Sequence, residues 1–166
     1  MSQPEYIDFN FSTKEQVQAF IKLFDQIKQI HNTKAGYQVT TLLALIPENV
    51  LTFFKAENQT SGWKPEHLIE FLIDDLDVFY LTVSEKDHDT YRLEFESNGY
   101  PYGGPDSLII LLRSYGLTPF KVDEGSGIYK VCWSSNYEYT LQNIIDQEEN
   151  QKGVSAKASK PWWRIW

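Results

Sequence analysis

The chain has 166 residues, of which 42% are hydrophobic and 15% aromatic. This length and composition predict one globular domain with a substantial core, and they argue against a disordered, collagen-like or linker chain. Residues 1–149 hold all 23 acids with 11 bases, whereas residues 150–166 hold four bases and no acid. We therefore expect one acidic domain over 1–150 and a basic, tryptophan-rich tail over 151–166.

The first predicted elements are a strand and a long helix. Residues 5–11 alternate between polar and apolar side chains, which is typical of a strand buried on one side. From Thr13 to His31, apolar residues recur every three or four positions, the pattern of an amphipathic helix, with Ser12 or Thr13 as its N-cap. His31 would then lie at the negative end of the helix dipole, which favours a cation.

The middle of the chain allows two interpretations. Residues 37–46 and 49–56 are rich in β-branched and aromatic side chains, which predicts a hairpin that turns at Pro47-Glu48. A helix over 49–56 fits as an alternative. Similar signals predict helices over 65–76, 105–116 and 135–150, and strands over 77–84, 90–97, 119–123 and 128–133.

The predicted order of elements points to an α+β fold. Strands and helices do not alternate strictly, so a doubly wound parallel sheet is disfavoured. We expect a mostly antiparallel sheet with helices packed on it. Residues 6–11 resemble residues 91–96 in pattern, and each stretch precedes a predicted helix and hairpin, which suggests two βαββ-like units. Shared strand periodicity explains the likeness equally well.

No residue pattern of a known catalytic or metal site is present in the sequence. A single cysteine, Cys132, excludes an internal disulfide and any multi-cysteine metal site, and no histidine is predicted beside it to generate a thiolate. His67, Glu70 and Asp74 can share one helix face and could bind a metal, although a solvated helix gives the same spacing. We expect no catalytic residue, no metal and no cofactor.

The densest group of acids lies on and just after the predicted helix over 65–76. We interpret these acids as a surface for a basic partner, with a solvated helix face as the alternative. Two tyrosines in a glycine- and proline-containing loop also suit contact with a protein. The predicted partner-binding residues are Glu66, Glu70, Asp74, Asp75, Asp77, Tyr100 and Tyr102.

The last residues predict an anchor. Trp162, Trp163 and Trp166 follow a polar tether, and burying tryptophan is strongly favourable, so the tail should dock on the acidic body or on a partner. The longest apolar run, Leu42 to Pro47, is too short for a membrane span, and the N-terminus lacks the features of a signal peptide. We expect a cytoplasmic protein that has no membrane span and does not bind nucleic acid directly, with an interfacial membrane contact of the tail as a less favoured third option.

A small acidic domain without catalytic residues, ending in the basic Pro161-Trp162-Trp163 segment, resembles small bacterial immunity proteins. That resemblance implies tight stoichiometric binding of a partner with a basic surface, such as a toxin domain. The expected function is therefore a non-enzymatic protein-binding module of the immunity or inhibitor type. Two alternatives stay open: a small-ligand or metal-dependent enzyme with an acidic cleft, and a nucleic-acid-mimicking inhibitor. The oligomeric state is left undetermined.

Overall fold

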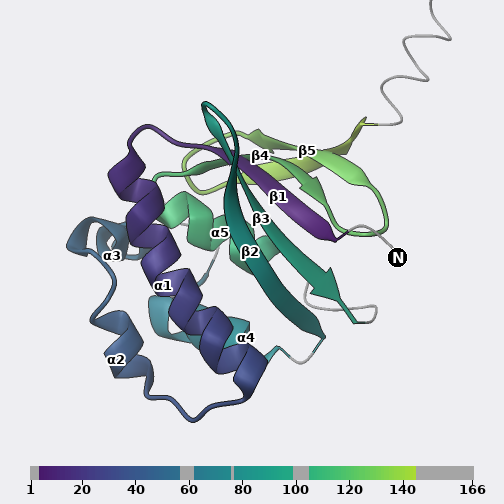
Figure 1. Cartoon of the computed structure of the whole chain (residues 1–166). Helices are drawn as coiled ribbons and strands as arrows, with labels where there is room; N and C mark the ends of the chain where they lie inside the picture. Colours follow the sequence, from purple (N-terminus) through teal and green to yellow (C-terminus); the bar gives the residue numbers. More distant parts are fainter. Residues whose placement is uncertain (1–3, 57–61, 76, 99–104, 145–166) are drawn as a thin grey trace, which may run out of the picture.

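A computed structural model of the chain, shown in Figure 1, describes residues 4–56, 62–75, 77–98 and 105–144. These residues form five helices and six strands. The elements in chain order are β1 (Glu5–Asn10), α1 (Lys14–Thr33), α2 (Val39–Leu43), α3 (Glu48–Lys55), α4 (Pro65–Asp74), β2 (Val78–Asp87), β3 (Thr90–Ser97), α5 (Asp106–Ser114), β4 (Thr118–Asp123), β5 (Ile128–Trp133) and β6 (Tyr139–Asn143).

The strands form one sheet in the order β2-β3-β1-β4-β5-β6, and every neighbouring pair is antiparallel. Strand β3 therefore separates the parallel strands β1 and β2, and β1 separates the parallel strands β3 and β4. Helices α1 to α4 connect the first parallel pair, and α5 connects the second. The result is two interlocked split β-α-β units, extended by β5 and β6. The predicted α+β fold with an antiparallel sheet is confirmed.

Helix α1 begins where the sequence predicts. The Thr13 side chain accepts a hydrogen bond from the Gln16 amide, and the Gln16 side chain accepts one from the Thr13 amide, which completes a capping box. The buried side of α1 then packs on the sheet, with the Phe9 and Phe20 ring centroids 6.1 Å apart. Phe24 is fully buried between Phe20 and Tyr80, each with its ring centroid 5.5 Å away.

The end of α1 is tied to two other elements by His31. This side chain is buried, and its two ring nitrogens lie 2.7 Å from the carbonyl oxygens of Ile73 and Val78. A carbonyl oxygen can only accept, so a ring nitrogen that forms a hydrogen bond here is its donor. His31 thus joins α1 to the end of α4 and the start of β2, in addition to lying in the last turn of its own helix.

The predicted hairpin over 37–56 is wrong, because this segment forms α2 and α3. Leu42 of α2, Ile46 between the two helices and Val50 of α3 are all buried, so each adds an apolar side chain to the core. Pro47 is the N-cap of α3, and its carbonyl accepts hydrogen bonds from Val50 and Leu51. The alternative helix over 49–56 is the one that forms. Because no hairpin follows α1, the first of the two suggested βαββ units does not exist.

The predicted helix over 135–150 is also wrong within the described residues. The Ser135 hydroxyl accepts from the amides of Tyr137 and Glu138, so the serine-glutamate spacing caps a turn. The chain then returns as β6, which pairs with β5 from Trp133↔Tyr139 to Tyr129↔Asn143. Pairing with a strand already in place satisfies the backbone here, and the local capping motif does not decide the structure.

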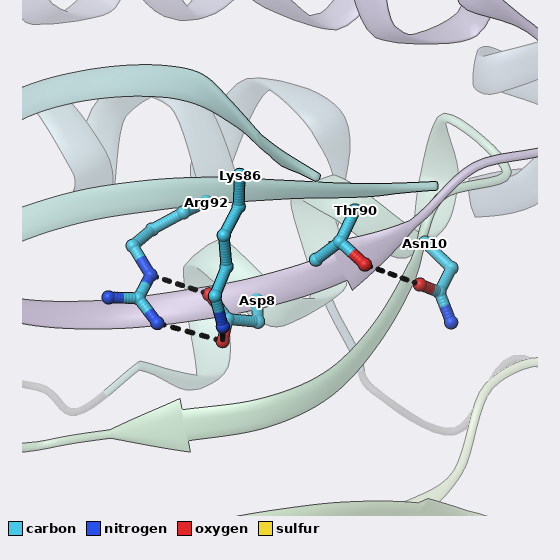
Figure 2. Close-up of polar contacts among 5 residues, drawn as sticks. All are labelled: Asp8, Asn10, Lys86, Thr90 and Arg92. Atoms are coloured by element: carbon cyan, nitrogen blue, oxygen red, sulfur yellow. Dashed lines mark hydrogen bonds and ion pairs between the residues drawn. The ribbon is translucent and has the colours of Figure 1, made fainter. Parts of the chain in front are cut away.

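One buried carboxylate, on the sheet face opposite the helices, links three strands through ion pairs. Asp8 of β1 is 0% exposed, and Arg92 of β3 donates to its two oxygens at 2.7 and 2.9 Å (Figure 2). Lys86 of β2 lies 2.8 Å from the same carboxylate. Burial alone raises the pKa of Asp8, but the hydrogen bonds and charges of Arg92 and Lys86 hold that pKa below its ordinary value.

An acidic surface on helix α4

Helix α4 separates apolar from acidic residues around its axis. Pro65 occupies the first turn, where its missing N–H costs nothing, and Glu66 there is favoured by the helix dipole. Four positions, two in each of two successive turns, face the core. Glu66, Glu70 and Asp74 follow one another at four-residue spacing on the other side of the helix. The buried positions are Leu68, Ile69, Leu72 and Ile73. The sequence predicts an apolar face with Leu68, Phe71, Leu72 and, as a further candidate, Leu76, opposite the acids; Leu68 and Leu72 are buried, Phe71 is only half-buried, and position 76 lies outside the described residues.

Three of the predicted acids border one hollow. A depression of about 260 Å³ is lined by Glu70, Phe71, Asp74 and Asp75, and we call it the acidic hollow. Phe71 is half-buried and contacts Trp63, with ring centroids 5.4 Å apart. An aromatic ring therefore forms part of a wall that is otherwise made by carboxylates.

Tyr37, in the segment before α2, contacts this surface, and its pKa responds to the negative charge there. Its hydroxyl donates to the Asp74 carboxylate, with oxygen-oxygen distances of 3.4 and 3.5 Å. Burial raises the pKa of Tyr37, and the charges of Asp74 and Glu70 raise it further. The tyrosine therefore stays protonated and remains a donor to Asp74 under ordinary conditions.

The acids of this surface have no ion pairs with any residue in the described part of the chain. The carboxylates that do have such partners are elsewhere: Asp8, Asp25 and Glu48. Asp75 instead accepts a hydrogen bond from the Asp77 amide at 3.0 Å, which shapes the turn into β2. The negative charge of the acidic hollow is thus left for solvent or a partner.

The remaining predicted site residues fall into two groups. Glu66 lies one turn before Glu70 on α4, and Asp77 is exposed just before β2, so both flank the acidic hollow without lining it. The other predicted residues, Tyr100, Tyr102, Trp162, Trp163 and Trp166, lie outside the described residues.

Sequence reasoning missed three aromatic residues of this surface. Phe71 was expected on the apolar side of the helix, whereas the structure places it at the boundary, beside Trp63. Trp63 lies two residues before Pro65, so its position near the helix start was readable from the sequence. Nothing local in the sequence connects Tyr37 to Asp74, because 37 residues separate them.

The metal-site alternative gains no support from the geometry. Across residues 4–56, 62–75, 77–98 and 105–144, no three His, Cys, Asp or Glu side chains are grouped so that they could hold a metal ion. His67, Glu70 and Asp74 are among these residues. Over the same ranges, no helix combines the length and the apolar character needed to cross a bilayer.

Comparison with known proteins finds no relative: the chain matches no family model, no curated protein sequence and no solved structure.

Proposed function

We propose that this protein is a non-enzymatic protein-binding module of the immunity or inhibitor type, and that the surface around α4 takes a basic partner. The observation that carries the proposal is the acidic hollow itself. It places Glu70, Asp74 and Asp75 around the half-buried ring of Phe71, and none of the three carboxylates has a cationic partner among the described residues.

This arrangement suits a lysine or arginine side chain of a partner. The aliphatic stem of such a side chain packs on an aromatic ring, and its charged end takes hydrogen bonds to carboxylates. The rings of Phe71 and Trp63 supply apolar contact area of the kind that dominates binding energy at interfaces. The hollow is small, at about 260 Å³, so it fits one side chain of a larger interface.

The charge of the chain supports the same class of partner. With a net charge of −8, the protein attracts a basic surface before contact and repels another acidic one. At physiological ionic strength this attraction extends over roughly 8 Å, so its effect falls mainly on the association rate. A toxin domain or a DNA-binding protein would present such a surface.

The test is affinity capture from cells that express this protein, followed by association kinetics with the protein recovered. The baits are the wild-type chain, Glu70→Lys/Asp74→Lys, and a control, Glu85→Lys/Asp89→Lys, which makes the same charge change in the β2–β3 hairpin. We expect a basic protein to bind the wild type and the control, and to associate at least about tenfold more slowly with the α4 variant.

Three results would contradict the proposal. One is that no protein is retained in a stoichiometric amount. Another is that both charge reversals slow association equally, which would mean that only net charge matters. The third is an association rate that does not respond to salt between about 20 and 300 mM, because steering between exposed charges is screened over that range.

A further inference from the structure

A second hollow, away from α4, has the opposite charge character. Its volume is about 630 Å³, and it lies among the start of α1, α3, the end of α5 and the turn before β6. Two bases and no acid line it, in a chain with 23 acids and 15 bases. We call it the Arg113 cleft; the lining residues used below are Ser12, Asn49, Lys55, Arg113, Thr118 and Asn136.

The Arg113 side chain is held in one position. Its Nε donates to the carbonyl oxygen of Asn136 at 3.3 Å, and its Nη2 donates to the Asn136 side-chain oxygen at 3.0 Å. Its Nη1 donates to the Thr118 hydroxyl at 2.9 Å. One face of the guanidinium lies over the Trp133 ring, 4.6 Å from its centroid. The Arg113 side chain therefore loses little conformational entropy when it binds a ligand.

These three hydrogen bonds do not use all the donors. A guanidinium has five N–H groups, so one on each terminal nitrogen remains without an acceptor among the described residues. Arg113 also has no carboxylate partner there, whereas Arg92 has Asp8. Burial lowers the pKa of Arg113, with no nearby acid to offset the loss of hydration. A half-buried cation of this kind is stabilised by an anion.

The cleft offers further donors around this cation. Ser12 and Asn49 make no side-chain hydrogen bond with any described residue, and Lys55 makes only a 3.5 Å contact to the exposed Glu48. The volume is within the range of small-molecule sites, about 300–1,000 Å³. A fixed arginine fork with neighbouring hydroxyl, amide and ammonium groups matches the acceptor geometry of an oxyanion.

We propose that the Arg113 cleft binds a small molecule through an oxyanion group, a carboxylate or a phosphate, that pairs with Arg113. This site is separate from the acidic surface of α4. The proposal for the Arg113 cleft therefore does not depend on the proposed protein partner. The shared chemistry of the two ligand types is a planar or tetrahedral set of anionic oxygens, which the two remaining N–H donors of Arg113 can bind.

The test is a titration of the full chain, labelled with nitrogen-15, with inorganic phosphate and separately with citrate, while chloride at matched ionic strength serves as the control. The signals followed are the Arg113 Nε–H and the Trp133 indole N–H, because Arg113 lines the cleft and its guanidinium lies over the Trp133 ring. We expect saturable shifts of these signals with at least one oxyanion and none with chloride. A response to phosphate alone or citrate alone assigns the ligand type.

Variants then identify the residue responsible. Arg113→Gln should weaken binding at least about tenfold, and Arg113→Lys should also weaken it because the fork is lost although the charge remains. The control Lys130→Gln removes one positive charge from β5, outside the cleft, and should leave binding unchanged. Shifts that do not saturate, that chloride reproduces, or that persist at wild-type affinity in folded Arg113→Gln and Arg113→Lys would overturn the proposal.

Discussion

Lys34 follows the last residue of α1 in the left-handed conformation, with φ of 54°. Its amide donates to the carbonyl of His31, so it closes the helix in the way that glycine usually does. A non-glycine residue in the left-handed region costs about 1–2 kcal/mol in folding free energy. Substitution by glycine removes this cost, but the net gain is smaller because glycine makes the unfolded chain more flexible. The nearest glycine, Gly36, lies two positions further along the chain.

We predict that Lys34→Gly raises the free energy of unfolding by about 0.5–1 kcal/mol, because it relieves the left-handed strain. Lys34 is exposed, so no packing is lost. Chemical denaturation measures the change. Lys34→Ala keeps the strain and should differ from the wild type by less than about 0.5 kcal/mol. Equal stabilisation by alanine would show that the lysine side chain, and not the backbone, is responsible.

Asp8 predicts a pH dependence of stability with a definite sign. Its pKa is held below the ordinary value in the folded state, so the folded protein binds fewer protons than the unfolded chain. The stabilisation is therefore complete above the unfolded pKa, about 3.9, and is lost as the pH falls through the folded pKa. Asp8→Asn should lower the free energy of unfolding at pH 7 by about 2–3 kcal/mol.

The measurement is urea denaturation of the wild type and Asp8→Asn between pH 7 and pH 3. The difference between the two proteins should shrink below about pH 4. Asp89→Asn, in the exposed turn between β2 and β3, is the control and should change stability by less than about 0.5 kcal/mol. A difference that stays constant down to pH 3 would mean that the Asp8 ion pairs contribute nothing to the pH dependence.

At the scale of elements, α1 is the helix on which the core depends. Phe24 is fully buried and contacts rings of its own helix and of β2. We predict that Phe24→Ala lowers the free energy of unfolding by about 3–5 kcal/mol, because it leaves a cavity. Phe79→Ala on β2 removes a ring that is 42% exposed and should cost far less. Similar melting temperatures for the two variants would contradict this assignment.

Elements were predictable where local pattern and final burial agree. Helices α1 and α4 each carry an apolar stripe, α5 has a continuous apolar run from Leu108 to Leu112, and the β2–β3 and β4–β5 hairpins have clear turn residues. Residues 37–56 were mispredicted because β-branched and aromatic side chains favour strands only where a sheet can accept them. In this chain β3 and β4 occupy both sides of β1, so no position next to β1 is left for a strand from that segment.

At the scale of the whole molecule, the sheet order predicts a gradient of local stability. Strand β1 is paired on both sides and has four consecutive buried residues, whereas β6 is an edge strand paired only with β5. We predict that the amides of Ile7 and Phe9 exchange with solvent only through global unfolding, and that the hydrogen-bonded amides of β6 exchange at least about 100-fold faster through local opening.

Native-state hydrogen exchange followed by NMR measures this gradient. Strand β2 provides the comparison, since it is the other edge strand but buries Val78 and Tyr80. Its amides near those residues should be slower than those of β6, where Leu141 is 36% exposed. Uniform protection across the sheet would show that β6 opens only together with the rest of the protein.

The sequence by itself determined the α+β class, the stripe of α1, the β2–β3 and β4–β5 hairpins and the grouping of acids on α4, because each depends on residues close together in the chain. Only the tertiary structure decided that His31 is a buried bridge, that Asp8 is covered by Lys86 and Arg92, and that Tyr37 contacts Asp74. The absence of an acid beside Arg113 among the described residues belongs to the same group. The hydrogen-bond partners of His31, Asp8 and Tyr37 are 37 to 84 residues away from them in the chain. Local propensity carries no information over such separations, and only the packing of the whole sheet brings these groups together.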